Sequence, residues 1–306
     1  MTARSPVEHE HQIISRRFGT PIDWSKLPAH THPKSEFVYP MTSRPRGIAL
    51  IINNEFFSCP SSEQENFDVR HGSEKDVEAL EWLFQALWFD VKIERNLGRQ
   101  QMLKILDDIS REDHSSYNCL VLFLMSYGRD GTLYGADGET VTISTVRDLF
   151  SNERCPTLKG KPKLIFIQSC RYSQIETPVE VGSTYNLDEP KAAIINDDAE
   201  LTADEANSDK YWNFDSTSYK TIPDHADFLI ANSTVSGHAS YRNEHSGSRF
   251  VQCIVEVFLE FAAYEDLLSM LTMVNERISE MGLINTKQVS EPTTTLRKKL
   301  YFWPGL

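Results

Sequence analysis

The chain has 306 residues, of which 40% are hydrophobic and 25% are charged, and its net charge is −13. A chain of this composition and length is an ordinary globular protein that can bury a sizeable core. No apolar run reaches the roughly 18 residues of a membrane-spanning helix, and an acidic balance without a basic stripe argues against nucleic acid or an anionic membrane as a partner.

The first half of the chain alternates predicted strands and helices. Residues 1–45 have no sustained hydrophobic period and are expected to form a short flexible leader. A buried strand is predicted at 48–53. Ser73 and Asp76 resemble a capping box, so a helix is expected to begin there and to continue through the apolar stripe of 74–89. A strand at 90–95 and a helix at 100–110 follow.

The stretch KLIFIQSCRY, residues 163–172, is the centre of the chemical argument. Earlier elements are a buried strand at 119–125 and a short helix near 143–150. In 163–172 an apolar run delivers Cys170 to the carboxyl end of a strand, where open α/β sheets place ligands and nucleophiles. The alternative is a small residue that closes the core, because free cysteine is among the most buried residue types.

After this strand the hydrophobic pattern stops over 173–222. Thirteen acidic residues against three lysines lie between Glu176 and Asp227, so this linker and its edges carry most of the negative charge. Long irregular segments of this kind are uncommon inside a compact domain and are usually functional or disordered. Order resumes with a strand at 226–233, helices at 249–262 and 267–281, and a closing strand at 296–303.

This alternation predicts an α/β fold of three layers, with a central six-stranded, mostly parallel twisted sheet and about five helices on its two faces. Five cysteines are scattered without a CxxC pair, which argues against a disulfide framework and a zinc site. The N-terminal stretch has no apolar core of the kind found in signal peptides. We therefore expect one folded cytoplasmic domain with no metal and no cofactor.

The chain resembles a caspase, a cysteine endopeptidase specific for aspartate, over nearly all of residues 44–306. The resemblance is carried by motifs that appear in the family's order and spacing: RGIALIIN, RHGS, GADGETV, GKPKLIFIQSCR, ADFLIANSTVSG, SYRN and LYFW. It implies a large-subunit region at 46–172, an intersubunit linker at 173–222 and a small-subunit region at 223–306.

The resemblance implies that Cys170 is the nucleophile, but the family's catalytic histidine is replaced. Its position, in a Ser-His-Gly motif, is held here by Tyr127, beside Gly128 of the oxyanion hole. A thiol has a pKa near 8.5 and needs an imidazole to take and return a proton, whereas a phenol of pKa about 10 does this poorly. Tyr172 also replaces a family glycine. Activity is therefore expected to be lost unless His71 or His238 substitutes.

The resemblance further implies a pocket for a substrate aspartate, built from Arg70, Gln168 and Arg242. Two guanidinium groups around one carboxylate explain such a preference through charge-assisted hydrogen bonds. The alternative is that these arginines pair with local acidic residues. Along the groove, Ala239 and Arg249 stand where the family often has aromatic walls, which suggests changed peptide binding.

Two further features concern processing and assembly. The linker reads Ile-Glu-Thr-Pro at 175–178 where family members are often cleaved after an aspartate, so self-processing is not expected there. Asp204 and Asp215 remain candidate sites for another protease. By resemblance, the closing strand forms the dimer interface through Leu300, Tyr301, Phe302 and Trp303.

The expected function is that of a non-catalytic pseudoenzyme, similar to the decoy caspases of insects and the caspase-like inhibitor proteins of vertebrates. It would pair with a catalytically active caspase paralogue, or with itself, and would more often enhance than inhibit apoptotic proteolysis. One alternative is a weak aspartate-directed cysteine endopeptidase that uses a different base. Another is a decoy that binds caspase inhibitors or peptides containing aspartate.

Overall fold

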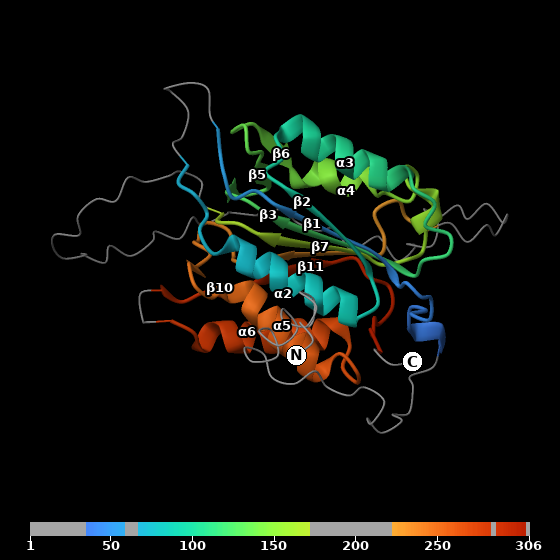
Figure 1. Ribbon diagram of the computed structural model, residues 1–306. Coiled ribbons are helices and arrows are strands. Elements are labelled where there is room, and N and C mark those ends of the chain that lie inside the picture. The colour runs from blue at the N-terminus through green and yellow to red at the C-terminus, as the bar shows by residue number, and fades with distance from the viewer. Residues whose placement is uncertain (1–34, 59–66, 172–221, 283–285, 304–306) are drawn as a thin grey trace, which may run out of the picture. The chain divides into compact units, whose positions relative to one another are not determined.

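A six-stranded sheet forms the centre of the computed structural model, which describes residues 35–58, 67–171, 222–282 and 286–303. Within this sheet, the first five strands in chain order are parallel to one another, and the sixth is antiparallel. The expected mixed α/β architecture is confirmed (Figure 1). The strand order across the sheet is β11 (Glu291–Thr294), β8 (Phe228–Asn232), β7 (Lys163–Gln168), β3 (Cys119–Met125), β1 (Gly47–Asn53) and β2 (Asp90–Arg95).

The three middle strands β1, β3 and β7 are buried along their whole length. Each is a continuous apolar run, the pattern typical of parallel strands that are covered on both faces. Phe123 of β3 lies beside Phe166 of β7 in register, with the two rings stacked at 5.3 Å. The sheet therefore places the residues that follow β3 and β7 at the same edge.

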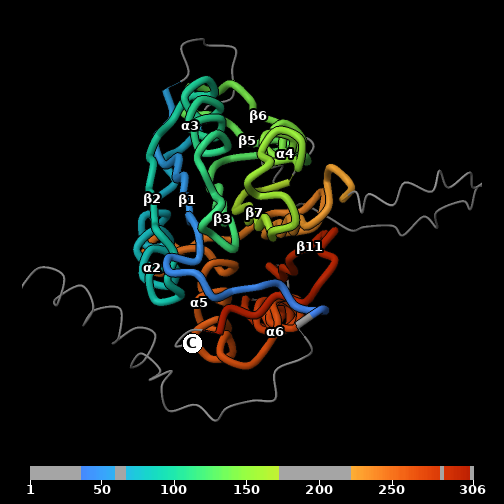
Figure 2. The backbone as a smooth tube through the Cα atoms, turned by 90° about the vertical axis from the view of Figure 1, so that its right-hand side faces the viewer, coloured from blue at the N-terminus to red at the C-terminus, as the bar shows by residue number. Residues whose placement is uncertain are grey.

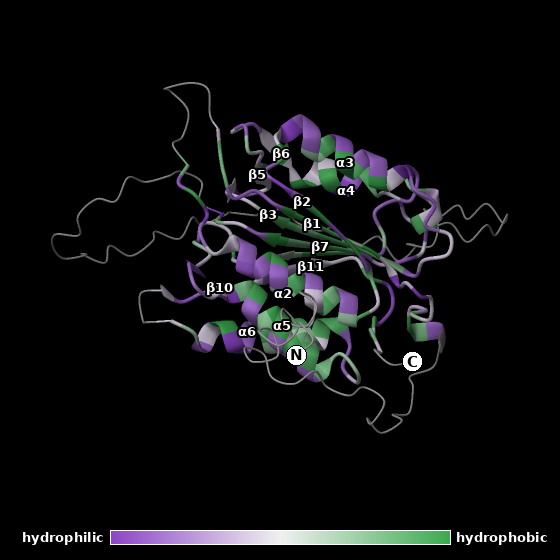
Figure 3. Cartoon of the chain, viewed as in Figure 1, coloured by the Kyte–Doolittle hydropathy of each residue, from purple (hydrophilic) through white to green (hydrophobic). Residues whose placement is uncertain are grey.

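Helices cover both faces of the sheet (Figure 1). One face carries α3 (Arg99–Arg111) and α4 (Ile143–Leu149), and the other carries α2 (Ser73–Ala86), α5 (Arg249–Phe261) and α6 (Leu267–Glu280). Their buried residues are mostly apolar and form two core clusters with the sheet, whose strands are strongly hydrophobic in Figure 3. The longest of these helices has 14 residues, too few to cross a bilayer, and no described helix is apolar enough to do so.

Two small antiparallel sheets and two 3-10 turns complete the described elements. One sheet joins β4 (Gly128–Arg129), β5 (Thr132–Tyr134) and β6 (Thr140–Thr142), and the other joins β9 (Arg242–Asn243) and β10 (Gly247–Ser248). The turns are η2 (Ser35–Phe37) and η3 (Pro156–Leu158). Strands of two or three residues are too short to show a sequence period, so the sequence did not predict them.

The expected closing strand at 296–303 is wrong. The sixth strand is β11, which pairs with β8, while Lys299 makes only an isolated bridge with Val38. Figure 2 shows the N-terminal and C-terminal segments side by side at this point. Leu300 and Phe302 are buried, as their alternation suggested, but they are held by packing in the core rather than by a ladder of hydrogen bonds.

The expected capping box at Ser73 is also wrong. The cap of α2 is Gly72, in a left-handed conformation with φ of 83°, and it makes no side-chain capping bond. The hydroxyl of Ser73 accepts a hydrogen bond from the Asn53 amide at 3.1 Å. Asp76 instead accepts the backbone N–H of Ser248 at 2.7 Å, so its carboxylate faces the β9–β10 hairpin rather than its own helix.

Phe166 offers a direct test of the sheet packing. Its ring is fully buried between Phe123 and Phe258, so Phe166→Ala is expected to lower the free energy of unfolding by about 3–5 kcal/mol. The control Phe37→Ala removes a ring that is 62% exposed and is expected to change it by less than about 0.5 kcal/mol. Urea unfolding curves measure both, and similar values for the two variants would contradict this packing.

Candidate active site

Cys170 lies two residues after the end of β7, and Tyr127 lies two residues after the end of β3. Because Met125 of β3 lies beside Gln168 of β7, both side chains emerge at the carboxyl edge of the sheet. The Cys170 thiol is half-buried and lies against the backbone of Ser240, with Sγ 3.5 Å from its nitrogen and 3.7 Å from its oxygen. The sequence prediction of a thiol at the end of a strand agrees with this placement.

The ring of Tyr127 belongs to an aromatic cluster of Phe57, Phe67, Tyr127 and Tyr134. It stacks on Phe67 at 4.8 Å and lies 5.2 Å from Phe57, and its hydroxyl donates to the Asp68 carbonyl at 3.2 Å. Burial raises the pKa of Tyr127, although the charges of Arg242 and Arg70 oppose this. The phenol is therefore neutral at pH 7 and is held by packing rather than poised to accept a proton.

Gly128 lets the chain after β3 approach the segment that carries the thiol. A Cβ at this position would lie 2.6 Å from the Thr132 carbonyl oxygen and 2.9 Å from Ser169 Oγ. No larger residue fits without a backbone shift. The close approach brings the Gly128 backbone next to Ser169, the residue before Cys170.

Arg70 is a buried cation at the same edge of the sheet. Its Nη1 donates to Asn53 Oδ1 at 3.2 Å and to the Asn54 carbonyl at 2.8 Å, whereas its buried Nη2 has no partner among the described residues. Burial, and then the neighbouring charge of Arg242, lower the pKa of Arg70 to about 9, so the guanidinium stays charged at pH 7. An unpaired buried donor of this kind is ready to bind an anion.

Gln168 and Arg242 complete this group. Gln168 is buried, its Nε2 donates to Ser240 Oγ at 2.8 Å, and its Oε1 has no partner in the described part of the chain. Arg242 on β9 is half-buried, and its Nε donates to the His71 carbonyl at 2.9 Å. The structure thus brings together the three residues of the predicted aspartate pocket, and neither arginine forms an ion pair with a described acidic residue.

The other predicted groove residues are arranged differently. Ala239 is half-buried in the loop before Ser240. Arg249 begins α5, and its guanidinium lies 4.6 Å from the centre of the Tyr241 ring and donates to the Thr286 carbonyl. The Arg249 guanidinium is therefore held by Tyr241 and Thr286, and it is not part of the group that contains Arg70 and Arg242.

Arg171 is a residue that the sequence reasoning did not single out. Its guanidinium, which is 13% exposed, forms ion pairs with Asp130 and with Glu291 of β11 and donates to the Thr234 carbonyl at 3.1 Å. Burial lowers the pKa of Arg171, but the bonds to Glu291 and Asp130 outweigh this and raise it. Arg171 therefore ties the loop of Cys170 to the strand at the edge of the sheet.

The remaining predicted site residues are either outside the described part or away from the thiol. Tyr172, Asp204 and Asp215 lie outside the described residues. Tyr301 and Trp303 stack on each other at 5.1 Å beside the buried Leu300 and Phe302. The histidines considered as substitute bases, His71 and His238, are exposed, and His238 Nδ1 lies 2.9 Å from the Ser236 carbonyl oxygen.

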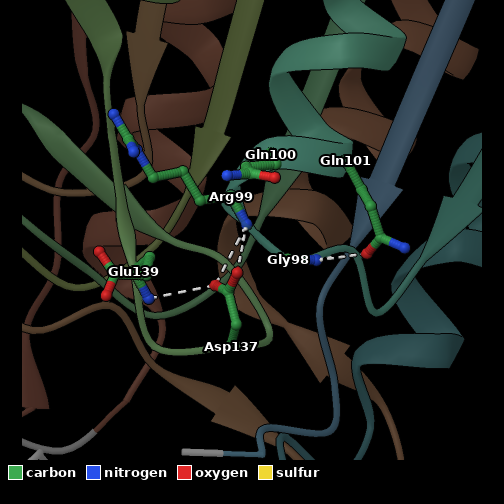
Figure 4. Close-up of a pocket in the computed structure, with 6 residues that line it drawn as sticks. All are labelled: Gly98, Arg99, Gln100, Gln101, Asp137 and Glu139. Carbon is green, nitrogen blue, oxygen red and sulfur yellow. Dashed lines mark hydrogen bonds between the residues drawn. The ribbon is translucent and has the colours of Figure 1, made fainter.

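A separate shallow pocket lies at the N-terminus of α3, where Asp137 caps the helix (Figure 4). The Asp137 carboxylate accepts the backbone N–H groups of Arg99 at 3.0 Å and of Glu139 at 3.1 Å. Since the helix end is already satisfied by this carboxylate, the pocket is not arranged to hold an anion. None of its lining residues belongs to the predicted site.

Comparison with known proteins points to the same family as the sequence motifs. The family model described as "Caspase domain" matches residues 46–301. Caspase-8 of Rattus norvegicus is 34% identical over 282 residues, which are 89% of this chain and 54% of that protein. Caspase-9 of Homo sapiens is 32% identical, with coverage of 88% and 64%, and caspase-7 of Gallus gallus is 32% identical, with coverage of 87% and 80%. The chain thus spans about half to four-fifths of these relatives.

The expectation that the chain is not an enzyme is contradicted by these comparisons. Its relatives are named caspases, which are cysteine endopeptidases, and none of the matches indicates a loss of catalysis. The expectation was wrong because the absence of one catalytic group, the imidazole replaced by Tyr127, does not by itself mean that all activity is absent. Enzymes that lose a member of the catalytic unit keep a residual rate from the remaining groups, of about 10³–10⁴ over the uncatalysed reaction in serine proteases.

Alkylation by iodoacetamide tests the placement of the thiol. Cys119, Cys155 and Cys253 are buried, and burial raises the pKa of each, whereas Cys170 is half-buried at a rim. In the folded protein at pH 7.5, Cys170 is expected to react at least about tenfold faster than these three, because only the accessible thiolate is a nucleophile. Peptide mapping by mass spectrometry measures the rates, and equal labelling of the four would contradict the arrangement.

Proposed function

This chain belongs to the caspase family, and from that premise we propose that it is an aspartate-directed cysteine endopeptidase of low intrinsic rate, which acts in apoptotic proteolysis mainly as the partner of a second caspase protomer. The observation that carries the proposal is the half-buried Cys170 thiol beside the convergence of Arg70, Gln168 and Arg242. This is a nucleophile next to a site for one carboxylate.

In the proposed reaction, Cys170 Sγ attacks the carbonyl carbon of the peptide bond that follows an aspartate. Arg70, Gln168 and Arg242 hold the aspartate side chain, and backbone N–H groups near Gly128 and Cys170 stabilise the oxyanion. The C–N bond breaks, the leaving amine takes a proton from water, and a thioester remains on the sulfur. Water hydrolyses the thioester and regenerates the thiol.

The low rate follows from Tyr127. An unperturbed thiol at pH 7 is only a few per cent thiolate. Among the described residues, no imidazole is packed beside Cys170 to raise that fraction or to protonate the leaving amine. Loss of such an acid and base slows a reaction by about 10²–10⁴-fold. The exposed His238 is the candidate for a substitute base, because its carbonyl accepts the Arg171 N–H at 3.1 Å and its loop is thereby anchored beside Cys170.

The proposed pairing uses β11 rather than residues 300–303. In the described part of the chain β11 is the last strand of the sheet, with Thr293 and Thr294 exposed, so its outer edge can accept a strand from another protomer. Glu291 on this strand forms an ion pair with Arg171, the neighbour of Cys170. A strand bound at the edge therefore biases the position of the cysteine loop, and the bias is reciprocal between two paired protomers.

The same reasoning favours a caspase paralogue as partner, with an enhancing effect. A protomer with a slow site of its own can stabilise the loops of the other protomer by pairing. Its own activity contributes little to the rate of the pair. We propose that 46–172 and 223–306 correspond to the large- and small-subunit regions joined by the linker 173–222. Asp204 and Asp215 remain candidate processing sites in that linker.

Tyr127→His tests the origin of the low rate. Restoring an imidazole is expected to raise kcat/KM on a peptide with an internal aspartate by about 10²-fold or more, because the thiol regains a base and the amine an acid. Tyr127→Phe is the matched control: it keeps the ring stacked on Phe67, loses only the bond to Asp68, and is expected to leave the rate unchanged. Adding Tyr172→Gly to Tyr127→His restores the family residues at both positions.

Cys170→Ala separates this enzyme from a contaminating peptidase, and it is expected to abolish cleavage in the parent and in Tyr127→His alike. Cleavage that survives Cys170→Ala, or a Tyr127→His protein that is folded but no faster than Tyr127→Phe, would contradict the proposed chemistry.

Thr293→Lys tests the pairing. A charged side chain on the exposed edge of β11 is expected to weaken strand addition, and with it both dimer formation with a caspase and the gain in that caspase's activity on an aspartyl peptide. Thr272→Lys makes the same change at an exposed position on α6 and is expected to have no effect. Sizes are measured by sedimentation; if the two lysine variants pair and stimulate equally, β11 is not the pairing strand.

A further inference from the structure

Asp76 is a buried carboxylate that the reaction above does not use. It lies in the first turn of α2 and is 1% exposed. Its Oδ1 accepts the backbone N–H of Ser248 at 2.7 Å, while its Oδ2 is buried and has no partner in the described part of the chain. A half-satisfied buried carboxylate is destabilising on its own, so its place in the fold needs a reason.

The structure fits Asp76 closely against the hairpin that carries Arg242. Ser248 of β10 pairs in register with Arg242 of β9, so the bond from Asp76 fixes the strand opposite that arginine. Gly247 has a φ of 84°, and a Cβ there would lie 2.2 Å from Asp76 Oδ1. The Asp76 carboxylate thus occupies the space that a side chain at position 247 would need.

Two positive charges act electrostatically on this carboxylate. Burial raises the pKa of Asp76 to about 6, and the bonds from Ser248 and the charges of Arg70 and Arg242 hold it from rising further. Arg70 comes from the loop before α2 and Arg242 from β9, and Asp76 in turn raises the pKa of Arg70. Within the described residues, Asp76 is thus an acidic group that interacts electrostatically with both arginines of the pocket.

We propose that Asp76 is a built-in counter-ion of the aspartate pocket, which competes electrostatically with the substrate carboxylate and couples its capture to the uptake of a proton. The inference rests on the proposed function, since it takes Arg70 and Arg242 as the aspartate site. With Asp76 ionised the three side chains carry a net charge of +1, and with Asp76 protonated they carry +2. The pocket therefore binds an aspartate side chain more tightly when Asp76 is neutral.

The direction with pH follows from linkage. Asp76 is ionised above about pH 6 and repels an incoming carboxylate, so binding raises the pKa of Asp76 further and brings a proton with it. Affinity for an aspartyl peptide consequently rises as the pH falls from 7.5 to 5.5, while the peptide's own carboxyl groups, with pKa values near 4, stay ionised. Because burial raises the pKa of Asp76 in the folded state, its ionised form also lowers stability at neutral pH.

The test measures the binding of two fluorescein-labelled peptides that are identical except for a C-terminal Asp or Asn. The ratio of their affinities isolates the side-chain carboxylate at each pH. For the parent protein this ratio is expected to rise about fivefold between pH 7.5 and 5.5, as a coupling of somewhat under one pKa unit implies. In Asp76→Asn the amide oxygen still accepts the Ser248 N–H, and the affinity ratio is expected to equal the parent's value at pH 5.5 at both pH values. The Tm of this variant is expected to be unchanged or higher.

Asp266→Asn is the matched control. It removes another buried carboxylate, at the N-cap of α6 and paired with Lys299, and it is expected to keep the pH dependence of the parent. His71→Ala is compared as well, because the exposed His71 lies beside the pocket and its carbonyl accepts a hydrogen bond from Arg242 Nε.

An Asp76→Asn protein that binds the Asp peptide more weakly than the parent, or that keeps the parent's pH dependence, would overturn the inference. If the parent shows no preference for Asp over Asn and Arg242→Ala changes nothing, the aspartate pocket itself is wrong and the proposed function fails with it. In a third outcome, Arg242→Ala abolishes the preference for Asp over Asn, but Asp76→Asn keeps the pH dependence of the parent. This result would overturn the counter-ion role of Asp76 and leave the aspartate pocket standing.

Discussion

The buried guanidinium of Arg70 is the constraint on which the functional end of the sheet depends. Removing a full charge from water is expensive unless polar groups surround it. Asn53 and Asn54 at the end of β1 supply two oxygens, but one nitrogen of Arg70 is left without a partner in the described part of the chain. Gln168 at the end of β7 leaves an unpaired oxygen in the same way. The continuous apolar strands bring these groups to one edge. An anion entering there can accept the unused N–H of Arg70, whereas the Gln168 oxygen needs a donor such as a peptide N–H.

At position 127 a packed phenol ring stands in place of the imidazole that the family resemblance implies. Where the resemblance implies an imidazole that works with the thiol, this chain has a ring that stacks on Phe67 and lies tilted against Phe57, with its hydroxyl bonded to the Asp68 carbonyl. Aromatic pairs of this kind contribute about 0.5–1.5 kcal/mol beyond the burial of their area. Such a trade between stability and rate is common at functional sites. In the proposed mechanism it leaves the nucleophile and the binding pocket in place and slows the steps that move protons.

Much of the architecture could be predicted from the sequence, because five strands and five helices have long and regular hydrophobic periods. The exceptions have physical causes. Residues 296–303 alternate like a strand, but the alternation is satisfied by burial of Leu300 and Phe302 without a neighbouring ladder. Asp76 was interpreted as part of a helix cap, because nothing local shows that a hairpin 172 positions away supplies its partner.

The candidate site divides along the same line. Cys170 could be located from its place after a buried strand, and the pocket arginines from family motifs. Arg171 could not be, because its meaning lies in an ion pair with Glu291, 120 positions further along the chain. Sequence periodicity reports on burial, whereas long-range pairing of polar groups is decided by the tertiary structure.

The central claim is that Cys170 remains a nucleophile beside a working aspartate pocket, and acylation by an activated ester tests it most directly. A p-nitrophenyl ester has a leaving group that needs no proton, so the missing imidazole matters least for this step. The account predicts that a peptidyl-aspartyl ester acylates Cys170, detected as a mass increase on that residue, much faster than the matching asparaginyl ester does. Equal rates for the two esters, or labelling that persists in Cys170→Ala, would contradict it.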